Sequence, residues 1–169
     1  MKNIFSIKDK VILVTGATGY LGRKMVEHLV KADAKVIALS RDINKLKKLA
    51  NDLSMSYEQI FEMDVSNEQD VKDIFLKIYQ KFNKIDVLVN LAGGNQAGAT
   101  IPPDKTIFDL DIDAFRTVVD LNLFGTVLPT MVFAEVMVGQ GKGSIINISS
   151  ESSLRPLTRV VGYGCAKAD

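Results

Sequence analysis

Residues 11–22 read Val-Ile-Leu-Val-Thr-Gly-Ala-Thr-Gly-Tyr-Leu-Gly. The apolar, mostly β-branched run at the start predicts a buried strand, and the glycines that follow predict a tight turn into a helix. In that order these elements form a phosphate-binding unit, because the turn admits a pyrophosphate and the helix N-terminus offers free N–H groups. A plain strand-to-helix turn is the alternative, but it gives no reason for three glycines. The stretch therefore predicts a dinucleotide-binding fold.

The rest of the chain alternates between short apolar runs and longer helical patterns. Strands are predicted at 36–39, 59–65, 85–90 and 144–149, and helices at 20–32, 42–53, 71–82, 112–138 and from about 162. Pro129 lies inside the long helix and should kink it, since proline has no N–H. We expect an α/β fold with a doubly wound parallel sheet of Rossmann type in three layers, α/β/α. No linker or repeat is visible, so residues 1–169 are expected to form a single domain.

Composition narrows the function classes. Hydrophobic residues make up 47% and charged residues 24% of the 169 residues, and the net charge is +1, which gives no argument for nucleic acid or a membrane surface. One cysteine and one histidine, His28, leave no disulfide framework and no metal-ligand cluster. The first nine residues have no apolar leader pattern. A soluble protein of the cytoplasm without a metal is expected.

The end of the second strand bears on the choice of cofactor. An acidic residue at its tip would bind the ribose 2′-hydroxyl of NAD, but the tip reads Leu39-Ser40-Arg41. Asp42, which follows, is better interpreted as the N-cap of the next helix. Ser40 and Arg41 could instead hold a 2′-phosphate, so NADP is favoured, with NAD as the alternative and an ordinary exposed arginine as the plainest explanation.

A tyrosine and a lysine share one face of the last predicted helix. Tyr163 and Lys167 are four residues apart, which places them one turn apart. A tyrosine hydroxyl has an ordinary pKa of about 10, and a neighbouring ammonium favours its phenolate form. Such a pair can exchange a proton with an alcohol or a ketone.

Together these motifs resemble the short-chain dehydrogenase/reductase family. The order and spacing match along the whole chain, and Ser150 precedes Tyr163 by 13 residues, as in the classical members. The resemblance rests on Thr15-Gly16, Gly19, Gly22, Asp64-Val65, Asn90-Leu91-Ala92-Gly93, Asn122, Ser150, Tyr163 and Lys167. It implies an NAD(P)-dependent oxidoreductase that transfers a hydride between nicotinamide and a ketone or secondary alcohol.

The resemblance also assigns roles. Tyr163 would be the acid/base, Ser150 would hold the substrate oxygen, Lys167 would assist Tyr163 and bind the nicotinamide ribose, and Asn122 would help to hold a relay water. Ser149 and Ser152 compete with Ser150 for its role, and a capping serine or an ordinary helical asparagine are simpler readings. The expected cofactor-binding residues are Thr15, Gly16, Thr18, Gly19, Tyr20, Leu21, Gly22, Ser40, Arg41, Asp64, Val65, Asn90, Ala92, Gly93, Tyr163 and Lys167.

A narrower resemblance concerns the substrate. Asn90–Asn95, Phe108–Asp111, Asp120–Thr130 and Arg155–Arg159 look like the D-mannonate oxidoreductase (fructuronate reductase) branch. The substrate would then be a hexuronate, D-mannonate or D-fructuronate. Arg155 or Arg159, with Asn95, could bind its carboxylate, because arginine offers a bidentate fork; exposed surface arginines are the simpler alternative.

Two departures keep other readings open. The loop Thr15–Gly22 has the spacing of the extended, nucleotide-sugar epimerase or dehydratase type, and Leu91 replaces a usual asparagine. Family members also continue beyond the Tyr-Lys helix with further strands and a substrate loop, so the chain reads as truncated at its C-terminus. A truncated dinucleotide-binding module without activity is therefore an alternative. We expect the full-length form to be a homodimer or homotetramer, and the present chain to be inactive, with an exposed fifth strand.

Overall fold

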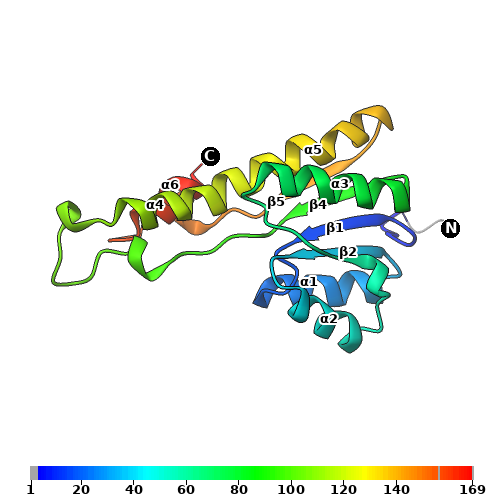
Figure 1. Ribbon diagram of the computed structural model, residues 1–169, viewed down its shortest axis with the longest axis horizontal. Coiled ribbons are helices and arrows are strands. Elements are labelled where there is room, and N and C mark those ends of the chain that lie inside the picture. The colour runs from blue at the N-terminus through cyan, green and yellow to red at the C-terminus, as the bar shows by residue number, and fades with distance from the viewer. Residues whose placement is uncertain (1–3, 156, 169) are drawn as a thin grey trace.

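The computed structural model describes residues 4–155 and 157–168, and its centre is a five-stranded sheet (Figure 1). The strands are β1 (Val11–Thr15), β2 (Lys35–Ser40), β3 (Ile60–Glu62), β4 (Val87–Asn90) and β5 (Ser144–Asn147). All neighbouring strands are parallel, in the order β3-β2-β1-β4-β5. The predicted Rossmann-type sheet is confirmed. Its carboxyl ends meet along one edge, which is where ligands bind in such folds.

The helices are α1 (Tyr20–Lys31), α2 (Ile43–Asp52), α3 (Glu68–Phe82), α4 (Ile112–Val119), α5 (Gly125–Gly139) and α6 (Val161–Lys167). Helices α1 and α2 cover one face of the sheet, and α3 and α5 cover the other, whereas α4 and α6 pack against each other. Alternate residues of each central strand enter two separate cores. Leu13 and Ile37 pack with α3 and α5, whereas Ile12 and Val36 pack with α1 and α2. The three predicted layers follow from this alternation.

Two helix starts show how well local sequence predicts a cap. Asp42 caps α2 as predicted, since its carboxylate accepts hydrogen bonds from the N–H groups of Asn44 and Lys45. Ser66 and Gln69 have the spacing of a capping box, which predicts Ser66 as the N-cap of α3, and this prediction is wrong. Asn67 is the N-cap, because the Ser66 hydroxyl donates instead to Asp64, at 2.6 Å.

The long helix is confirmed but contains an irregularity before its proline. Asp120–Phe124 forms a π-helical turn between α4 and α5, one turn ahead of the kink expected at Pro129. Such turns often occur at functional sites, and Asn122 lies inside this one. The run Ile112–Gly139 is long and apolar enough to cross a membrane by length and composition. Phe133 and Met137 nevertheless pack in the main core, so the run is a core helix.

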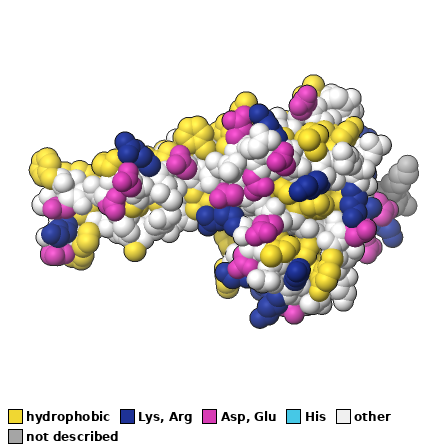
Figure 2. All heavy atoms as spheres, in the orientation of Figure 1, with side chains coloured by type: hydrophobic (Ala, Val, Ile, Leu, Met, Phe, Trp, Pro, Cys, Tyr) yellow, Lys and Arg dark blue, Asp and Glu magenta, His cyan; other side chains and the backbone are white. Residues whose placement is uncertain are grey.

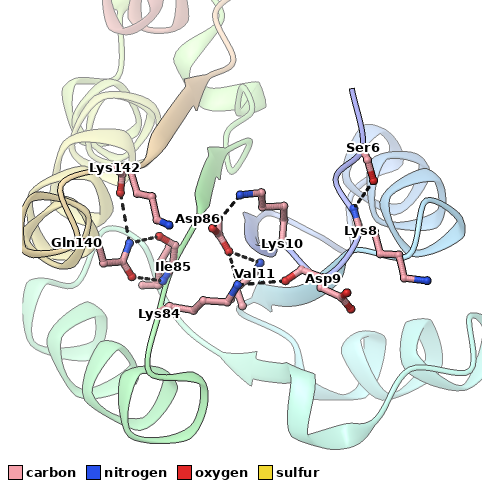
Figure 3. Close-up of polar contacts among 10 residues, drawn as sticks. All are labelled: Ser6, Lys8, Asp9, Lys10, Val11, Lys84, Ile85, Asp86, Gln140 and Lys142. Atoms are coloured by element: carbon pink, nitrogen blue, oxygen red, sulfur yellow. Dashed lines mark hydrogen bonds and ion pairs between the residues drawn. The ribbon is translucent and has the colours of Figure 1, made fainter. Parts of the chain in front are cut away.

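The amino ends of β1 and β4 are fastened by one carboxylate (Figure 3). Asp86 accepts the Val11 N–H at 2.9 Å and lies 3.3 Å from the Lys10 ammonium and 2.9 Å from that of Lys84. Partial burial acts to raise the pKa of Asp86. The hydrogen bond from Val11 and the two ammonium groups outweigh it and hold that pKa below its ordinary value.

A side-chain amide extends this fastening to the end of α5. Gln140 accepts from the Ile85 N–H at 3.0 Å and donates to the Ile85 carbonyl at 2.8 Å, as a neighbouring strand would (Figure 3). Both bonds lie at the end of the sheet opposite the expected site. The contacts at this end therefore serve to hold β1, β4 and α5 together.

The last third of the fold extends away from the sheet. The segment after β4, together with α4 and α6, forms a projection from the main body (Figure 1), and Figure 2 shows apolar side chains at its far end. Ile107 and Phe108, which belong to the segment after β4, are exposed apolar residues. All four residues of β5 are exposed, as expected for the edge of this sheet.

Candidate active site

The glycine-rich loop between β1 and α1 is held against the segment that follows β4. Gly16 has a φ of +65°, and a methyl group there would lie 2.8 Å from the Ala92 Cα. At Gly22 a methyl group would lie 2.2 Å from the Gly16 carbonyl oxygen. The Thr15 hydroxyl accepts the N–H groups of Leu91 and Ala92 at 3.1 and 3.0 Å. Gly16 and Gly22 thus lie where neighbouring backbone leaves no room for a side chain. The Thr15 hydroxyl holds the segment after β4 against the loop.

A cleft of about 340 Å³ opens beside this loop at the carboxyl ends of the strands. It is lined by residues from the ends of β1, β2, β3 and β4 and by the start of α1. The predicted residues on its wall are Gly16, Thr18, Gly19, Tyr20, Leu21, Ser40, Arg41, Val65, Ala92 and Gly93. Met63, Leu91 and Leu121 complete it and were not among the predicted binding residues. Their only sequence signal was an apolar side chain just beyond a strand or inside the long helix.

The tip of β2 is joined to the glycine loop by a side-chain bond. The hydroxyls of Thr18 and Ser40 lie 2.7 Å apart, and Arg41 is exposed on the cleft wall. The Asp42 carboxylate is turned to the helix it caps. The charge presented at this end of the cleft is therefore that of a guanidinium.

Asp64, Asn90 and Gly22 were expected at the cofactor but are not among the residues that line the cleft. Asp64 accepts both the N–H and the hydroxyl of Ser66. Asn90 is buried and donates to Thr130 and Asn147, both at 2.9 Å. Asn90 thus joins β4 to α5 and β5, in agreement with the structural reading of a residue at a strand end.

Asn122 and Lys167 converge on the glycine that lines the cleft. A methyl group at Gly93 would lie 2.7 Å from the Asn122 Oδ1 and 3.4 Å from the Lys167 Nζ. Asn122 also accepts the Gly94 N–H at 3.0 Å and donates to the Gly94 carbonyl at 2.7 Å. Lys167 is buried, and its ammonium donates to the Ile148 carbonyl at 2.8 Å. Residues far apart in the sequence thus meet at one point beside the cleft.

The serines after β5 have different local partners. Ser150 caps the short helix Glu151–Ser153, since its oxygen accepts the Ser152 N–H at 3.2 Å, and its hydroxyl donates to the Ser152 oxygen at 3.2 Å. The Ser149 hydroxyl donates to the Lys167 carbonyl at 3.1 Å. Ser149 therefore ties the end of β5 to α6, and Ser150 has the capping role that was one of its two interpretations.

Helix α6 carries Tyr163 and Lys167 and packs against α4. A methyl group at Gly162 would lie 3.1 Å from the ring of Phe115, and Ala166 is buried. Tyr163 is half-buried in this short helix. Small residues on one side of α6 let it lie close to α4, which supports this short helix.

The residues predicted to bind a substrate carboxylate are not equivalent. Arg155 is exposed, and Pro156, which follows it, lies outside the described residues. The Arg159 guanidinium donates to the carbonyl oxygens of Pro102 and Lys105. The Asn95 amide donates to the Thr100 hydroxyl at 2.8 Å. The structure thus ties Asn95 and Arg159 to the loop after β4.

Comparison with known proteins gives the chain its family. Residues 10–169 match the model of the short chain dehydrogenases. The chain belongs to the short chain dehydrogenase family. An uncharacterized oxidoreductase of Haemophilus influenzae is 32% identical over 96% of the chain, and one of Staphylococcus saprophyticus is 30% identical over 96%. The predicted family and oxidoreductase class are confirmed.

Solved structures of similar proteins have the same fold. A Haemophilus influenza protein provisionally assigned as a D-mannonate oxidoreductase, with bound NAD, has a TM-score of 0.88 at 31% identity and matches 96% of this chain and 62% of its own. NAD-bound xylitol dehydrogenase has a TM-score of 0.86 at 26% identity and matches 96% and 61%. The present chain spans 61% of the length of the H. influenzae relative and 68% of the S. saprophyticus one.

Proposed function

We propose that this chain is the dinucleotide-binding and proton-transfer part of a reductase that moves a hydride between nicotinamide and a ketone or secondary alcohol. The observation that carries this proposal is the meeting of Asn122 and Lys167 at Gly93, on the wall of the cleft. The glycine loop accounts for dinucleotide binding but not for catalysis. The buried Lys167 and Asn122 beside the cleft supply the polar groups that a proton relay would use.

The cleft fits a dinucleotide in its chemistry. Its wall combines the glycine loop and the N-terminus of α1, which suit a pyrophosphate, with the apolar side chains of Met63, Val65 and Leu121, which suit a flat ring. The bound dinucleotide would supply or accept the hydride. Ala92 and Gly93 would lie beneath its nicotinamide half, and Ser40 and Arg41 would lie at its adenosine half.

The protein's own residues would manage the proton. The Lys167 ammonium, which donates to the Ile148 carbonyl at 2.8 Å, would assist Tyr163 and hold the ribose. Tyr163 would give its proton to the carbonyl oxygen in reduction and recover it through Lys167. Ser150 would turn its hydroxyl from Ser152 to that oxygen and stabilise the negative charge that develops there. Asn122 would keep the loop at Gly94 in place beside a relay water.

Within this proposal NADP is the favoured cofactor and NAD the alternative. Arg41 lies on the cleft wall, and the acidic side chain that follows it in the sequence, Asp42, caps α2. Two similar structures contain NAD, so the choice needs a direct test.

Arg41→Ala is expected to weaken NADPH binding roughly tenfold, the loss of about one charge-assisted contact, and to leave NADH binding unchanged. Lys47→Ala, an exposed lysine of α2 outside the cleft, is the matched control. Tighter binding of NADH than of NADPH that persists in Arg41→Ala would overturn the assignment.

A hexuronate is the proposed substrate. The support is the similarity to the Haemophilus protein provisionally assigned as a D-mannonate oxidoreductase, together with the exposed Arg155 near the start of α6. We further propose that the chain is one Rossmann domain lacking its C-terminal strands and substrate loop. The longer form would act as a dimer or tetramer in the cytoplasm.

The test of this function separates binding from turnover. Fluorescence titration of the present chain with NADPH and NADH measures binding. Absorbance at the reduced nicotinamide band measures turnover of D-fructuronate and unrelated ketones by the longer form. Lys167→Ala should weaken binding, and Tyr163→Phe should keep binding and abolish turnover. Binding without turnover of any carbonyl compound would favour an inactive dinucleotide-binding module. Absence of binding would contradict the proposal as a whole.

A further inference from the structure

Arg159 has an unusual backbone conformation, and both its guanidinium and its backbone carbonyl make hydrogen bonds. Its φ is +68°, in the left-handed region that costs an ordinary side chain roughly 1 kcal/mol. It precedes α6 by two residues. A residue keeps such a backbone conformation only where surrounding contacts offset its free-energy cost. The contacts of Arg159 therefore show what holds it in place.

Those contacts all go to one loop. The Arg159 guanidinium donates to the carbonyl oxygens of Pro102 and Lys105, and the Arg159 carbonyl accepts the Ile101 N–H at 2.9 Å. The Lys105 N–H donates to the Pro102 carbonyl at 3.0 Å, which closes a turn and brings the two acceptors together. The guanidinium therefore holds a preformed turn, because its Nη1 donates to both of these carbonyl oxygens.

The same loop is fastened at its other end by the candidate site. Gly94 is bonded through both its N–H and its carbonyl to Asn122. Between the two attachments Ala99 and Ile101 are buried, and a methyl group at Gly98 would lie 3.1 Å from the Ala114 Cβ. The segment 94–105, hereafter the site loop, is thus attached to α4, to Asn122 and to the residues that lead into α6. It also carries Asn95.

We infer that Arg159 is a positioning residue that fixes the site loop to the start of the Tyr163 helix, and that Arg155 is the arginine left to bind the substrate carboxylate. This inference rests on the proposed function only for its second half, the carboxylate. The first half concerns the chain itself. The Arg159 Nη1 is engaged with Pro102 and Lys105, whereas Arg155 is exposed, so of the two arginines we assign the carboxylate to Arg155.

Hydrogen exchange on the ligand-free chain tests the first half. Arg159→Asn removes the guanidinium but keeps a residue that tolerates the left-handed region. The amides of Ile101 and Lys105 should then exchange roughly tenfold faster, as the loss of a charge-assisted hydrogen bond permits, while the amides of β1 stay unchanged. Arg159→Lys should restore part of the protection. Arg155→Asn, the matched control on an exposed arginine, should change nothing.

Exchange at Ile101 and Lys105 within twofold of the wild type in Arg159→Asn would overturn the positioning role. Unchanged exchange of β1 reports that each variant has folded. If Arg159→Asn does not fold, Arg159→Lys decides: intermediate protection supports the inference, and wild-type protection contradicts it.

The second half is tested on the longer form, with D-mannonate as the probe and the dinucleotide present. Arg155→Asn should raise the Michaelis constant at least tenfold with kcat little changed, the signature of lost ground-state binding. Arg159→Lys should lower kcat and leave the Michaelis constant nearly unchanged. The reverse pattern would assign the carboxylate to Arg159. If the longer wild-type form binds the dinucleotide but turns over no D-mannonate, the carboxylate half fails, and the exchange result for Arg159 stands independently.

Discussion

Strands β4 and β5 are neighbours in one sheet, yet their side chains differ widely in how far they are buried. Leu88 pairs with Ile145 and Val89 with Ile146. Leu88 is fully buried and Val89 is 3% exposed, whereas Ile145 and Ile146 are 36% and 46% exposed. Similar apolar side chains in matched register thus have opposite environments.

The difference shows that burial of a strand is decided by what covers it. Leu88 packs in the core formed with α3 and α5, and Val89 in the core formed with α1 and α2. Neither Ile145 nor Ile146 of β5 belongs to one of these cores. Ile148, the residue after the strand end at Asn147, packs against the core formed with α1 and α2. The apolar sequence of β5 therefore predicts a strand correctly but overstates the free energy that this strand contributes.

The largest effect expected from this comparison is on stability. Leu88→Ala removes a fully buried side chain and should lower the free energy of unfolding by about 3 kcal/mol, the range typical of core cavities. Ile145→Ala, its partner in the register, should cost under about 1 kcal/mol, because its side chain is already partly in water. Urea denaturation of both variants measures the difference. Equal losses would mean that β5 is covered in solution by another chain.

A second contrast lies at the amino ends of the two strands. β4 is fastened to β1 through Asp86, which accepts the Val11 N–H and pairs with two lysines. Asp86→Asn should lower the free energy of unfolding at pH 7 by about 1.5 kcal/mol, as for hydrogen bonds to charged groups. Since the folded pKa of Asp86 lies below its ordinary value, this stability is present above about pH 4, the pKa range of a free carboxyl. It is lost as the pH falls through the folded pKa.

The measurement is urea denaturation of wild type and Asp86→Asn from pH 7 down to pH 3. The two stabilities should converge at the acid end. Asp104→Asn, which changes an exposed aspartate, should follow the wild type throughout. A difference that stays constant down to pH 3 would show that Asp86 acts through shape rather than charge.

The fold was predictable because its signals are local. The alternation of β-branched runs with helical spacing gave the sheet and its layers, and the N-cap at Asp42 could be read from three neighbouring residues. The cap of α3 was misassigned because Ser66 has a nearer acceptor, Asp64, which no spacing rule represents. The π turn at Asp120–Phe124 was likewise out of reach, since the only disruption visible in the sequence was Pro129.

The site was predictable where a residue type has few other uses. Glycines at a strand end and a tyrosine four residues before a lysine pointed to the cleft and its surroundings. Met63 and Leu121 line the cleft but resemble any core residue in the sequence. The role of Arg159 depends on carbonyl groups more than fifty positions away. Long-range backbone contacts of that kind leave no pattern in a single sequence.

The smallest effect on stability, and the sharpest on association, is expected at the exposed strand. Ile146→Lys places a charge on an open sheet edge, which natural proteins use to prevent edge-to-edge pairing. The free energy of unfolding should change by less than about 1 kcal/mol, while light scattering of a concentrated solution should fall. Val89→Lys, at the paired position in β4, buries the same charge and should unfold the chain. If Ile146→Lys unfolds the chain as well, the exposure of β5 does not hold in solution. If scattering is unchanged, association uses another surface, such as the projection that carries Phe108.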